Sequence, residues 1–539
     1  MQKKYIFVTG GVLSGLGKGI AAASIGHILS HKYSVIPIKL DGYLNTDPGT
    51  MNPQEHGEVF VLDDGAEVDM DFGHYERFLN CTCTKDQSIT MGKIFAETQI
   101  KERRGDYLGK TVQMIPHVTD LIKEKIKLAT KDADIAIIEV GGTIGDIEAE
   151  LFVEGIRQLA SEVGEKNALF VHLTYVPIPN HVGEPKTKPS QQSVKLLLER
   201  GLHPDIVLGR CTEPLTDKIK QKLSLFCNVK ERAVLSANDV KNIYEIPELY
   251  HKQGLISLLN EKLGLDLSYE MPLRWEQLTK NLNSLKTTDQ EITIAVCGKY
   301  TALEDSYASI VESLIHCKAN TKTNINMKMI ETSNLETDQD VKKALVGIDG
   351  VIVPGGFGNR GTEGKIKVIK HVRENKIPFL GICFGLQLAV LEFARNICNL
   401  KEATSEEFDS SAKVQMVKYL PGQNEAVDMG GTLRLGDYKA YLEGQTKITE
   451  IYEGDIANER HRHRYEINPD YHQILKENGL SLAGLSKDKK LIEFISLETH
   501  PYFVGTQGHP ELKSKLEKPA PLFLGLAKAA IKRKDSVND

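Results

Sequence analysis

Four features are scarce or absent in this sequence of 539 residues, and each absence excludes a class of protein. Eight cysteines are too few for a disulfide framework in a chain of this length. The longest apolar runs, such as IAIIEV and LFVHL, are much shorter than a membrane span. Excess positive charge is absent, because 67 basic and 73 acidic residues give a net charge of −6, which disfavours nucleic acid as the main partner. The first residues, MQKKYIFVTGG, lack the long apolar core of a signal peptide, so we expect a cytoplasmic protein.

Short apolar runs alternate with helix-compatible stretches along the chain. The runs are continuous rather than alternating, as in strands of a parallel sheet that is covered on both faces. The pattern stops in the polar stretch 266–290 and then restarts. We therefore predict two doubly wound α/β domains, at 1–265 and 291–539, joined by a linker at 266–290. The predicted strands are 4–10, 34–40, 134–140, 168–176, 205–210, 291–300, 350–358 and 377–385, and the predicted helices of the first domain are 19–31, 116–130, 148–163 and 190–200.

A glycine-rich turn, GGVLSGLGKG, follows the first predicted strand and leads into a predicted helix. In a Walker A loop, G-x-x-x-x-G-K-[ST], the final hydroxyl holds Mg²⁺. Gly17 and Lys18 match this pattern, but Val12 occupies the place of the first glycine and Gly19 that of the hydroxyl. Backbone N–H groups in such a turn still point at one spot, where phosphate binds. We interpret the turn as a P-loop-like phosphate site whose metal is held by residues elsewhere.

Acidic residues after other strands could replace the missing hydroxyl. Glu139 ends the predicted strand 134–140, and ligands of parallel sheets collect at the carboxyl ends of strands. Asp69 and Asp71 form a second candidate pair, because they share one side of an extended segment. Lys39 ends the neighbouring strand and would bring a second ammonium to the same crevice. We predict Mg²⁺ held between carboxylates and nucleotide phosphates.

The turn GEPKTKPSQQSVK, residues 183–195, mixes lysines with hydroxyl and amide side chains at the start of a predicted helix. This mixture suits an anionic ligand with hydrogen-bonding edges, such as a second nucleotide. A solvated lysine turn is the alternative interpretation.

The stretch G-I-C-F-G at 381–385 resembles a nucleophile elbow with Cys383 in the nucleophile position. Its glycines allow a strained turn between strand and helix, and the helix N-terminus favours a thiolate. VPGGFG at 353–358 offers backbone donors for an oxyanion. A nucleophilic thiol needs a base and an orienting carboxylate, which His509 and Glu511 could supply. A buried structural cysteine is the alternative, and the combination of features favours the nucleophile. Cys81 and Cys83, by contrast, have no second pair at zinc-site spacing and are interpreted as ordinary thiols.

Long stretches of the chain resemble the CTP synthase family and keep the family's order along almost the whole sequence. They are YIFVTGGVLSGLGKGIAAAS, NTDPGTMNPQEHGEVFVLDDGAEVDMDFGHYERF, KERRGDYLGKTVQMIPHVTD, EVGGTIGDIE, KTKPSQQSVK, ERHRHRYE and the segment with His509 and Glu511. The resemblance implies an N-terminal amidoligase domain and a C-terminal class I glutamine amidotransferase domain. It implies that MgATP phosphorylates O4 of UTP, and that ammonia released from L-glutamine at Cys383 attacks C4 to give CTP. Because ammonium is no nucleophile, this scheme requires a sheltered passage for ammonia.

The resemblance also implies roles for individual residues. Catalysis is expected at Cys383, His509, Glu511, Lys18 and Lys39, and the metal at Asp71 and Glu139. ATP is expected at Gly15, Leu16, Gly17, Lys18, Gly19, Ile20, Asp71, Asn238, Asp239 and Val240. UTP or inhibitory CTP is expected at Ser14, Asp146, Ile147, Glu148, Lys186, Thr187, Lys188, Pro189, Ser190, Gln191 and Lys222. L-Glutamine is expected at Gly356, Phe384, Gly385, Leu386, Gln387, Glu407 and Arg464.

Further expectations from the family are activation by GTP, a homotetramer and, in several members, filaments. Arg103, Leu108 and the loop around Phe357 fall where allosteric and domain-interface elements are expected. The chain departs from the usual family pattern at Gly42, Phe384, Thr506 and Gly508, and we expect Gly508 to loosen the strand that holds His509.

Two alternative functions are also compatible with parts of the sequence. One is another ATP-dependent glutamine amidotransferase that amidates a carboxylate in cofactor biosynthesis. The other is a nucleotide-sensing structural protein without activity, which the two complete sets of catalytic residues disfavour.

Overall fold

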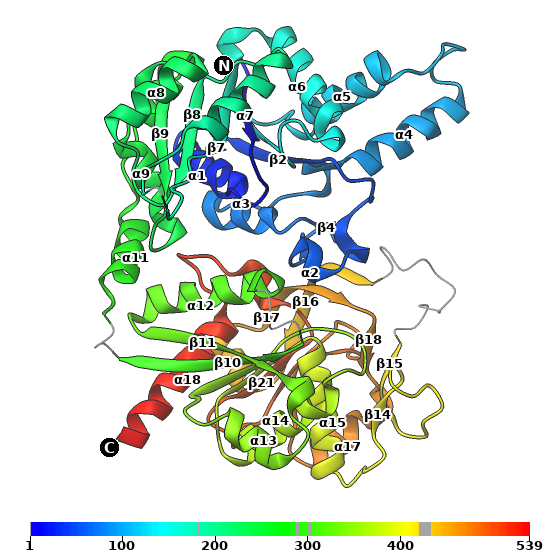
Figure 1. Ribbon diagram of the computed structural model, residues 1–539. Helices are drawn as coiled ribbons and strands as arrows, with labels where there is room; N and C mark the ends of the chain where they lie inside the picture. The colour runs from blue at the N-terminus through cyan, green and yellow to red at the C-terminus, as the bar shows by residue number, and fades with distance from the viewer. Residues whose placement is uncertain (1, 182, 287–289, 300–303, 420–432, 539) are drawn as a thin grey trace. The chain divides into compact units, whose positions relative to one another are not determined.

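The protein was analysed as a computed structural model that describes residues 2–181, 183–286, 290–299, 304–419 and 433–538 (Figure 1). The chain forms two compact units: the first comprises Met1–Pro48 and Asp71–Thr279, and the second Gly49–Met70 and Lys280–Asp539. The segment 49–70 lies inside the first predicted domain, yet it packs with the second unit. Residues 287–289 of the predicted linker lie outside the described ranges. None of the helices in the described ranges is long and apolar enough to cross a membrane.

The first unit is built on a seven-stranded parallel sheet in the order β5-β2-β6-β1-β7-β8-β9. The apolar runs predicted as strands occupy its centre and are buried along nearly their whole length. The strands are β1 (Lys4–Gly10), β2 (Val35–Asp41), β5 (Ser88–Thr90), β6 (Ile135–Val140), β7 (Ala168–Tyr175), β8 (Ile206–Cys211) and β9 (Val234–Asn238).

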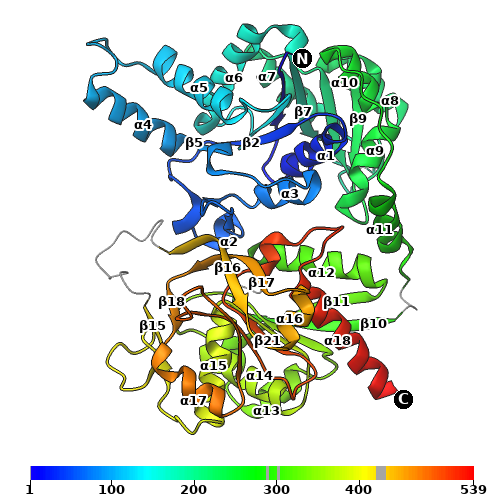
Figure 2. The same cartoon turned by 180° about the vertical axis from the view of Figure 1, so that it is seen from behind.

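Helices cover both faces of this sheet, as the views from front and back show (Figure 2). One core lies between the sheet and α5, α6 and α7, and α1 packs on the opposite face beside α3 and α9. This arrangement confirms the predicted doubly wound α/β class. The helices are α1 (Lys18–Ser30), α3 (Asp71–Leu79), α4 (Met91–Arg104), α5 (Thr119–Ala129), α6 (Glu150–Val163), α7 (Lys188–Glu199), α8 (Asp217–Cys227), α9 (Ile246–Lys252), α10 (Leu255–Leu263) and α11 (Leu273–Ser284).

The second unit contains a nine-stranded mixed sheet in the order β11-β10-β12-β13-β21-β20-β19-β16-β17. Its β10–β13 and β21 strands run parallel, and the remaining strands pair antiparallel. The strands are β10 (Glu291–Gly298), β11 (Asn324–Glu331), β12 (Gly350–Val353), β13 (Phe379–Ile382), β16 (Arg434–Leu442), β17 (Ile456–His463), β19 (Ser481–Leu485), β20 (Ile492–Ser496) and β21 (Phe503–Thr506).

All three strands predicted for this unit are shorter in the structure, and the ends of β12 and β13 shape the loops beside them. β12 ends at Val353 because the following PGGFG loop leaves the sheet, and β13 ends at Ile382 because Cys383 adopts a positive φ of 52°. Both ends create the loops at which the candidate glutaminase site lies.

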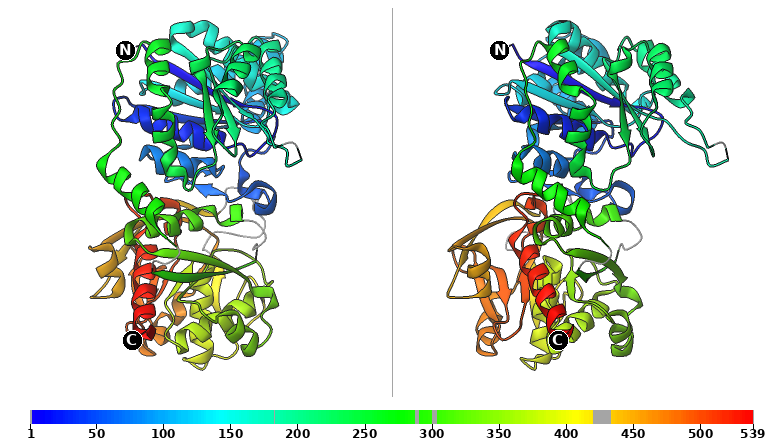
Figure 3. Two further views of the ribbon diagram at one scale, coloured as in Figure 1. Left: turned by 60° about the vertical axis from the view of Figure 1, so that its left-hand side comes forward. Right: turned by 90° about the vertical axis from the view of Figure 1, so that its left-hand side faces the viewer.

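Helices also cover both faces of the second sheet (Figure 3). One core includes α13, α14 and α15, and the other includes α12, α16 and α18. The helices are α12 (Ala308–Thr321), α13 (Asp338–Ala344), α14 (Thr362–Glu374), α15 (Phe384–Asn396), α16 (Lys447–Tyr452), α17 (His472–Glu477) and α18 (Pro521–Asn538). A small sheet of β14 (Thr404–Ser405), β15 (Gln415–Tyr419) and β18 (Tyr465–Ile467) flanks them.

The segment 49–70 carries α2 (Pro53–His56) and the hairpin of β3 (Phe60–Val61) and β4 (Glu67–Val68). Two arginines of β17 hold it: Arg460 Nε lies 2.6 Å from Asp63 Oδ1, and Arg462 Nε lies 2.7 Å from Glu67 Oε1. Glu67 and Arg460 are buried, so these ion pairs have little competition from water.

Candidate active sites

The glycine-rich turn joins β1 to α1 at the carboxyl edge of the first sheet. Gly15 and Gly17 have φ of 74° and 92°, a backbone conformation that glycine adopts without steric cost. Lys18 begins α1, and its Nζ donates to the carbonyl oxygen of Gly142, 2.8 Å away, in the loop after β6. The lysine is thus held across the turn, where phosphates bind in sites of this kind.

Gly19 explains why the loop lacks the Walker hydroxyl. A Cβ atom at this position would lie 2.0 Å from Asp71 Oδ1 and 2.6 Å from Asp71 Cγ. The carboxylate at the start of α3 therefore occupies the space in which a serine or threonine would stand. The structure replaces a hydroxyl on the loop by a carboxylate from another helix.

Buried charges converge beside this loop. Lys39 Nζ lies 2.8 Å from Glu139 Oε1 and 3.9 Å from Asp41 Oδ1, and it also contacts Asp71 Oδ2. The hydroxyl of Tyr75 on α3 donates to Glu139 Oε2. The structure thus brings together four residues predicted from the sequence: Lys18, Lys39, Asp71 and Glu139. Lys18 belongs to this cluster because its charge interacts with those of the other three.

Burial sets the electrostatics of this cluster. It raises the pKa of Glu139, an effect that the charge of Asp71 increases and that of Lys39 opposes. Burial also raises the pKa of Asp41 to about 6 and lowers that of Lys18. A bound cation would stabilise the charged carboxylates.

The donor set fits Mg²⁺. No cluster of three or more His, Cys, Asp or Glu side chains forms a metal site within the described residues. Mg²⁺ does not need one, because it commonly uses one or two carboxylates together with water and substrate phosphates. The residues that would hold Mg²⁺ are Asp71 and Glu139. Asp71 can approach the loop because Gly19 has no side chain.

A cavity of about 250 Å³ connects the loop to the end of β9. Apolar side chains such as Leu16, Ile20 and Tyr250 line it, as is usual in small-molecule pockets. The loop residues and the 238–240 segment predicted to bind ATP meet there. The residues that line the cavity and were predicted to bind ATP are Gly15, Leu16, Gly17, Ile20, Asn238, Asp239 and Val240.

The predicted second-nucleotide turn lies at the N-terminus of α7. Thr187 precedes the helix, and Gln191 Nε2 donates to its Oγ1 at 3.0 Å. Ser190 is buried and bonded to the carbonyl of Tyr175, so its hydroxyl shapes the turn. Lys222 on α8 acts electrostatically on Glu184 in the same turn. Ser14 is exposed in the phosphate loop, and Ile147 is exposed in the 146–148 turn.

In the second unit, Cys383 lies at a strained turn between β13 and α15. Its φ and ψ are 52° and −103°, and its N–H donates to the carbonyl of Thr506 at 2.7 Å. Close packing requires the flanking glycines, because a Cβ at Gly385 would lie 2.1 Å from the carbonyl oxygen of Val353. Strain of this kind is held by its surroundings and is common at active sites.

His509 and Glu511 form the predicted pair. His509 Nδ1 lies 2.7 Å from Glu511 Oε1, and His509 Nε2 has no hydrogen-bond partner among the described residues. Burial lowers the pKa of His509, but the charges of Glu511 and Cys383 outweigh it and raise the value to about 10. A Cβ at Gly355 would lie 2.9 Å from His509 Cε1 and 3.7 Å from Cys383 Cβ, so both side chains flank this glycine.

Cys383, His509 and Glu511 line a cavity of about 260 Å³ within the second unit. Gly355, Gly356 and Phe357 from the loop after β12 line it too, so the loop predicted to offer backbone donors shares the cavity with the thiol. The segment 49–70 supplies part of the wall. Its lining residues are Gly49, Thr50, Met51, Glu58 and Val59.

Comparisons with known proteins decide the family. Residues 4–265 match the model described as CTP synthase N-terminus, and residues 302–529 match glutamine amidotransferase class-I. The CTP synthase of Methanococcus aeolicus is 49% identical over 98% of this chain and 99% of that protein. The CTP synthase of Syntrophus aciditrophicus is 47% identical over 100% of both chains. The chain belongs to the CTP synthase family.

Family membership confirms the predicted class, a glutamine-dependent ligase, and does not favour the carboxylate-amidating alternative. Among solved structures, the glutaminase domain of Trypanosoma brucei CTPS with bound acivicin is 34% identical, with a TM-score of 0.42, over 45% of this chain and 94% of that one.

Of the residues that the CTP synthase resemblance assigns to L-glutamine, one lines the Cys383 cavity. Gly356 lines it, whereas the side chains of Phe384, Leu386 and Gln387 are buried in α15. Glu407 Oε1 accepts the N–H of Gly358 at 2.6 Å, which holds the loop after β12. Burial raises the pKa of Glu407, and the nearby charges of Lys299 and Arg464 oppose this shift.

Three departures from the CTP synthase pattern have local explanations. A Cβ at Gly42 would lie 2.7 Å from the carbonyl oxygen of Glu148, so glycine lets the 146–148 turn approach β2. A Cβ at Gly508 would lie 2.7 Å from Glu459 Cβ on β17. The chain around Gly508 is nevertheless held, because Thr506 Oγ1 donates to the Gly508 carbonyl at 3.3 Å and His509 N–H to the Arg460 carbonyl at 2.7 Å.

The expected allosteric elements are exposed. Leu108, with 87% of its surface exposed and φ of 53°, lies in the loop after α4, and Arg103 pairs with Glu102 on the same helix. Phe357 lies in the loop after β12, where Arg462 stacks over its ring at 6.0 Å.

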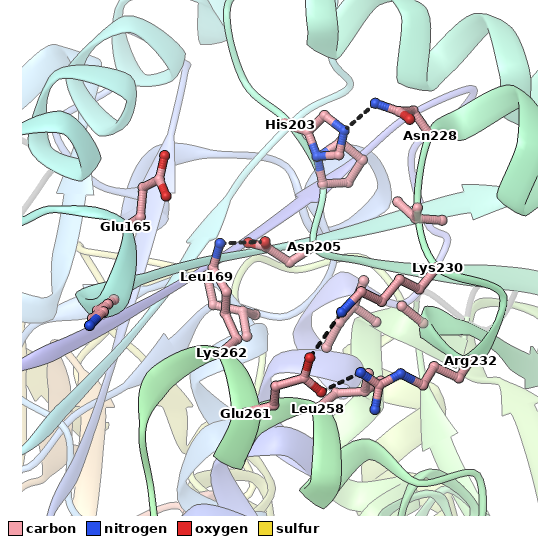
Figure 4. A pocket seen from close by; sticks show the side chains of 15 residues that line it. Glu165, Leu169, His203, Asp205, Asn228, Lys230, Arg232, Leu258, Glu261 and Lys262 are labelled. Atoms are coloured by element: carbon pink, nitrogen blue, oxygen red, sulfur yellow. Dashed lines mark hydrogen bonds and ion pairs between the residues drawn. The ribbon is translucent and has the colours of Figure 1, made fainter.

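Another cavity, of about 380 Å³, lies at the amino ends of β7, β8 and β9 (Figure 4). Its charged side chains bind one another: Lys262 Nζ lies 2.7 Å from Asp205, and Lys230 and Arg232 share Glu261. Ligands of parallel sheets collect at the opposite edge, so we assign it no part in the reaction.

Sequence reasoning missed two members of the charge cluster, Tyr75 and Asp41. Tyr75 lies one turn after Asp71 on α3, and this i, i+4 spacing was the available signal. Asp41 lies two residues after Lys39 on β2, so both point to one face.

Proposed function

We propose that this chain forms CTP from UTP, with each unit carrying one half of the reaction. The first unit would use MgATP to phosphorylate O4 of UTP, and ammonia would then displace phosphate at C4. The second would release that ammonia from L-glutamine. The observation that carries the proposal is the convergence of Cys383 with the His509–Glu511 pair in one cavity, in a chain whose whole length matches CTP synthases.

In the proposed glutaminase, His509 holds the proton of the Cys383 thiol while the thiolate attacks the side-chain carbonyl carbon of glutamine. Glu511 orients the imidazole and stabilises its charge. Backbone N–H groups of Gly356 and Phe384 would stabilise the developing oxyanion. Breaking the C–N bond releases ammonia with the proton from His509, and water then cleaves the thioester. Glu407 and Arg464 would bind the α-amino and α-carboxylate groups of glutamine.

In the proposed synthetase, Lys18 and Lys39 stabilise negative charge on the phosphoryl group as it moves from ATP to UTP. Asp71 and Glu139 would hold Mg²⁺, which when bound neutralises phosphate charge and orients the phosphoryl oxygens. Tyr75 fixes Glu139, and Gly19 leaves room for Asp71. The cavity between the loop and residues 238–240 would bind adenine.

The pyrimidine nucleotide is assigned to the 186–191 turn, Ser14 and Lys222, with CTP using the 146–148 turn. We further propose activation by GTP, inhibition by CTP, a homotetramer able to form filaments, and a cytoplasmic location. Eight cysteines without a disulfide among the described residues agree with a reducing compartment.

The test is an absorbance assay of UTP-to-CTP conversion with glutamine or with ammonia. Cys383→Ala should abolish the glutamine-dependent reaction and spare the ammonia-dependent one. Glu139→Gln should abolish both, while glutamine hydrolysis at Cys383 persists. Loss of both reactions in Cys383→Ala would contradict the two-site proposal.

A further inference from the structure

Gln507 contacts the sulfur of the proposed nucleophile. It follows β21 and is completely buried, and its Nε2 lies 3.7 Å from Cys383 Sγ. Among the described residues, Cys383 Sγ is the only hydrogen-bond partner of this amide nitrogen. Neither the P-loop-like site nor the predicted glutaminase residues include Gln507.

A chain of amides fixes which end of Gln507 faces the sulfur. Gln387 Nε2 on α15 donates to the carbonyl oxygen of Tyr465 at 3.0 Å, and this backbone group can only accept. The same Nε2 lies 3.3 Å from Gln507 Oε1. Because Oε1 is engaged by a donor, the NH₂ end of Gln507 must point to Cys383.

Besides His509, whose charge acts on Cys383, the sulfur has a backbone carbonyl and an amide donor beside it. Cys383 Sγ lies 3.8 Å from the carbonyl oxygen of Arg462, which can accept a hydrogen bond from a thiol but repels a thiolate. The NH₂ of Gln507 interacts more strongly with a thiolate, because hydrogen bonds to ionised acceptors are stronger. Gln507 therefore favours the ionised sulfur, which is the nucleophile.

We propose that Gln507 is a further catalytic residue of the glutaminase, whose side-chain Nε2–H donates to Cys383 Sγ and stabilises the attacking thiolate. This inference rests on the proposed function. It adds no bond change to that reaction: the S–C bond forms, the C–N bond breaks, and the proton held by His509 leaves with ammonia. Gln387 is a positioning residue that orients Gln507.

Other charged groups also face Cys383 and must stay constant in a test. His509 and Glu511 approach from the C-terminal segment, Lys365 from α14, Arg462 from β17, and Glu58 from the segment 49–70. Substitutions at Gln507 leave all of them in place, so a change in thiol ionisation reports on the amide.

The experiment compares Gln507→Met, Gln507→Glu and Gln387→Met in the full-length protein. The rate of iodoacetamide labelling of the Cys383 peptide is measured against pH by mass spectrometry. We expect Gln507→Met to move the midpoint of the rate profile up by about one pH unit, and to lower kcat for glutamine hydrolysis roughly 10-fold with little change in KM. Gln507→Glu should shift the midpoint further, because it places an acceptor against the thiolate, and Gln387→Met less.

Two controls keep the proposal testable. A parent-like circular dichroism spectrum and thermal unfolding transition show that each variant is folded. Asn468→Leu removes another buried amide, bonded to the carbonyl of Gln415, without contact to Cys383. An unchanged labelling midpoint in folded Gln507→Met would overturn the proposal. Absence of glutamine hydrolysis in the parent protein would instead refute the proposed function. The labelling profile does not depend on glutamine hydrolysis, so the two failures can be distinguished.

Discussion

Replacing Gly19 by alanine tests the central feature of the phosphate site, the exchange of a loop hydroxyl for the carboxylate of Asp71. The added Cβ would lie 2.0 Å from Asp71 Oδ1, 2.6 Å from Cγ and 3.2 Å from Cβ. Distances below 3.0 Å are not tolerated, so the side chain of Asp71 must move away from the loop. Gly19→Ser should fail in the same way, although it restores the Walker hydroxyl.

The size of the effect follows from that displacement. Relieving the contact requires Asp71 to shift by roughly 1 Å or more, and a misplacement of that size at a catalytic group costs about 100-fold in rate. Because Asp71 is proposed to hold Mg²⁺ for phosphorylation, kcat for CTP formation should fall with glutamine and with ammonia alike. The free energy of unfolding should fall by about 2 kcal/mol at most, since overpacking costs about 1–3 kcal/mol and alanine regains up to about 1 kcal/mol in a helix.

Gly26→Ala is the matched control. Gly26 lies two turns further along α1 and also packs against α3, where its Cβ would lie 2.9 Å from Leu79 Cδ1. This neighbour is the end of a flexible side chain away from the charge cluster, so activity should remain close to that of the parent. Both variants are compared in the UTP-to-CTP assay over a range of Mg²⁺ concentrations. Parent-like kcat in Gly19→Ala would refute the assignment of Asp71 to the space beside Gly19.

Two further predictions concern the second unit. The pKa of His509 is raised from 6.5 to about 10, so the stability that it contributes should be present below pH 6.5 and disappear as pH rises towards 10. Glu511→Gln should weaken this dependence of Tm on pH. An identical dependence in the variant would contradict the role of Glu511. Arg434 lies 2.6 Å from Glu493 and 2.9 Å from Glu466, both buried, so Arg434→Met should lower the free energy of unfolding by about 3–5 kcal/mol in denaturant titrations. Replacement of the exposed Arg103, whose partner is Glu102 on the same helix, is the control and should have little effect on stability.

The sequence alone determined the elements whose signals are local. Continuous apolar runs predicted the strands, the GLGKG turn predicted a phosphate site, and G-I-C-F-G predicted the elbow at Cys383. These patterns depend on side-chain periodicity and backbone conformation within a few residues. The i, i+2 spacing of His509 and Glu511 likewise sufficed to pair them, and their contact is 2.7 Å.

Tertiary structure decided the contacts that join distant parts of the chain. The space beside Gly19 is filled by a residue 52 positions away, and the thiol of Cys383 meets an amide 124 positions away. The segment 49–70 belongs by sequence to the first predicted domain, yet ion pairs with Arg460 and Arg462 hold it in the second unit. Burial raises the pKa of Glu139, and the charge of Lys39 opposes that shift. The burial and the position of Lys39 both depend on tertiary packing. Such contacts have no local pattern, because the sheet and its helices must form before their partners meet.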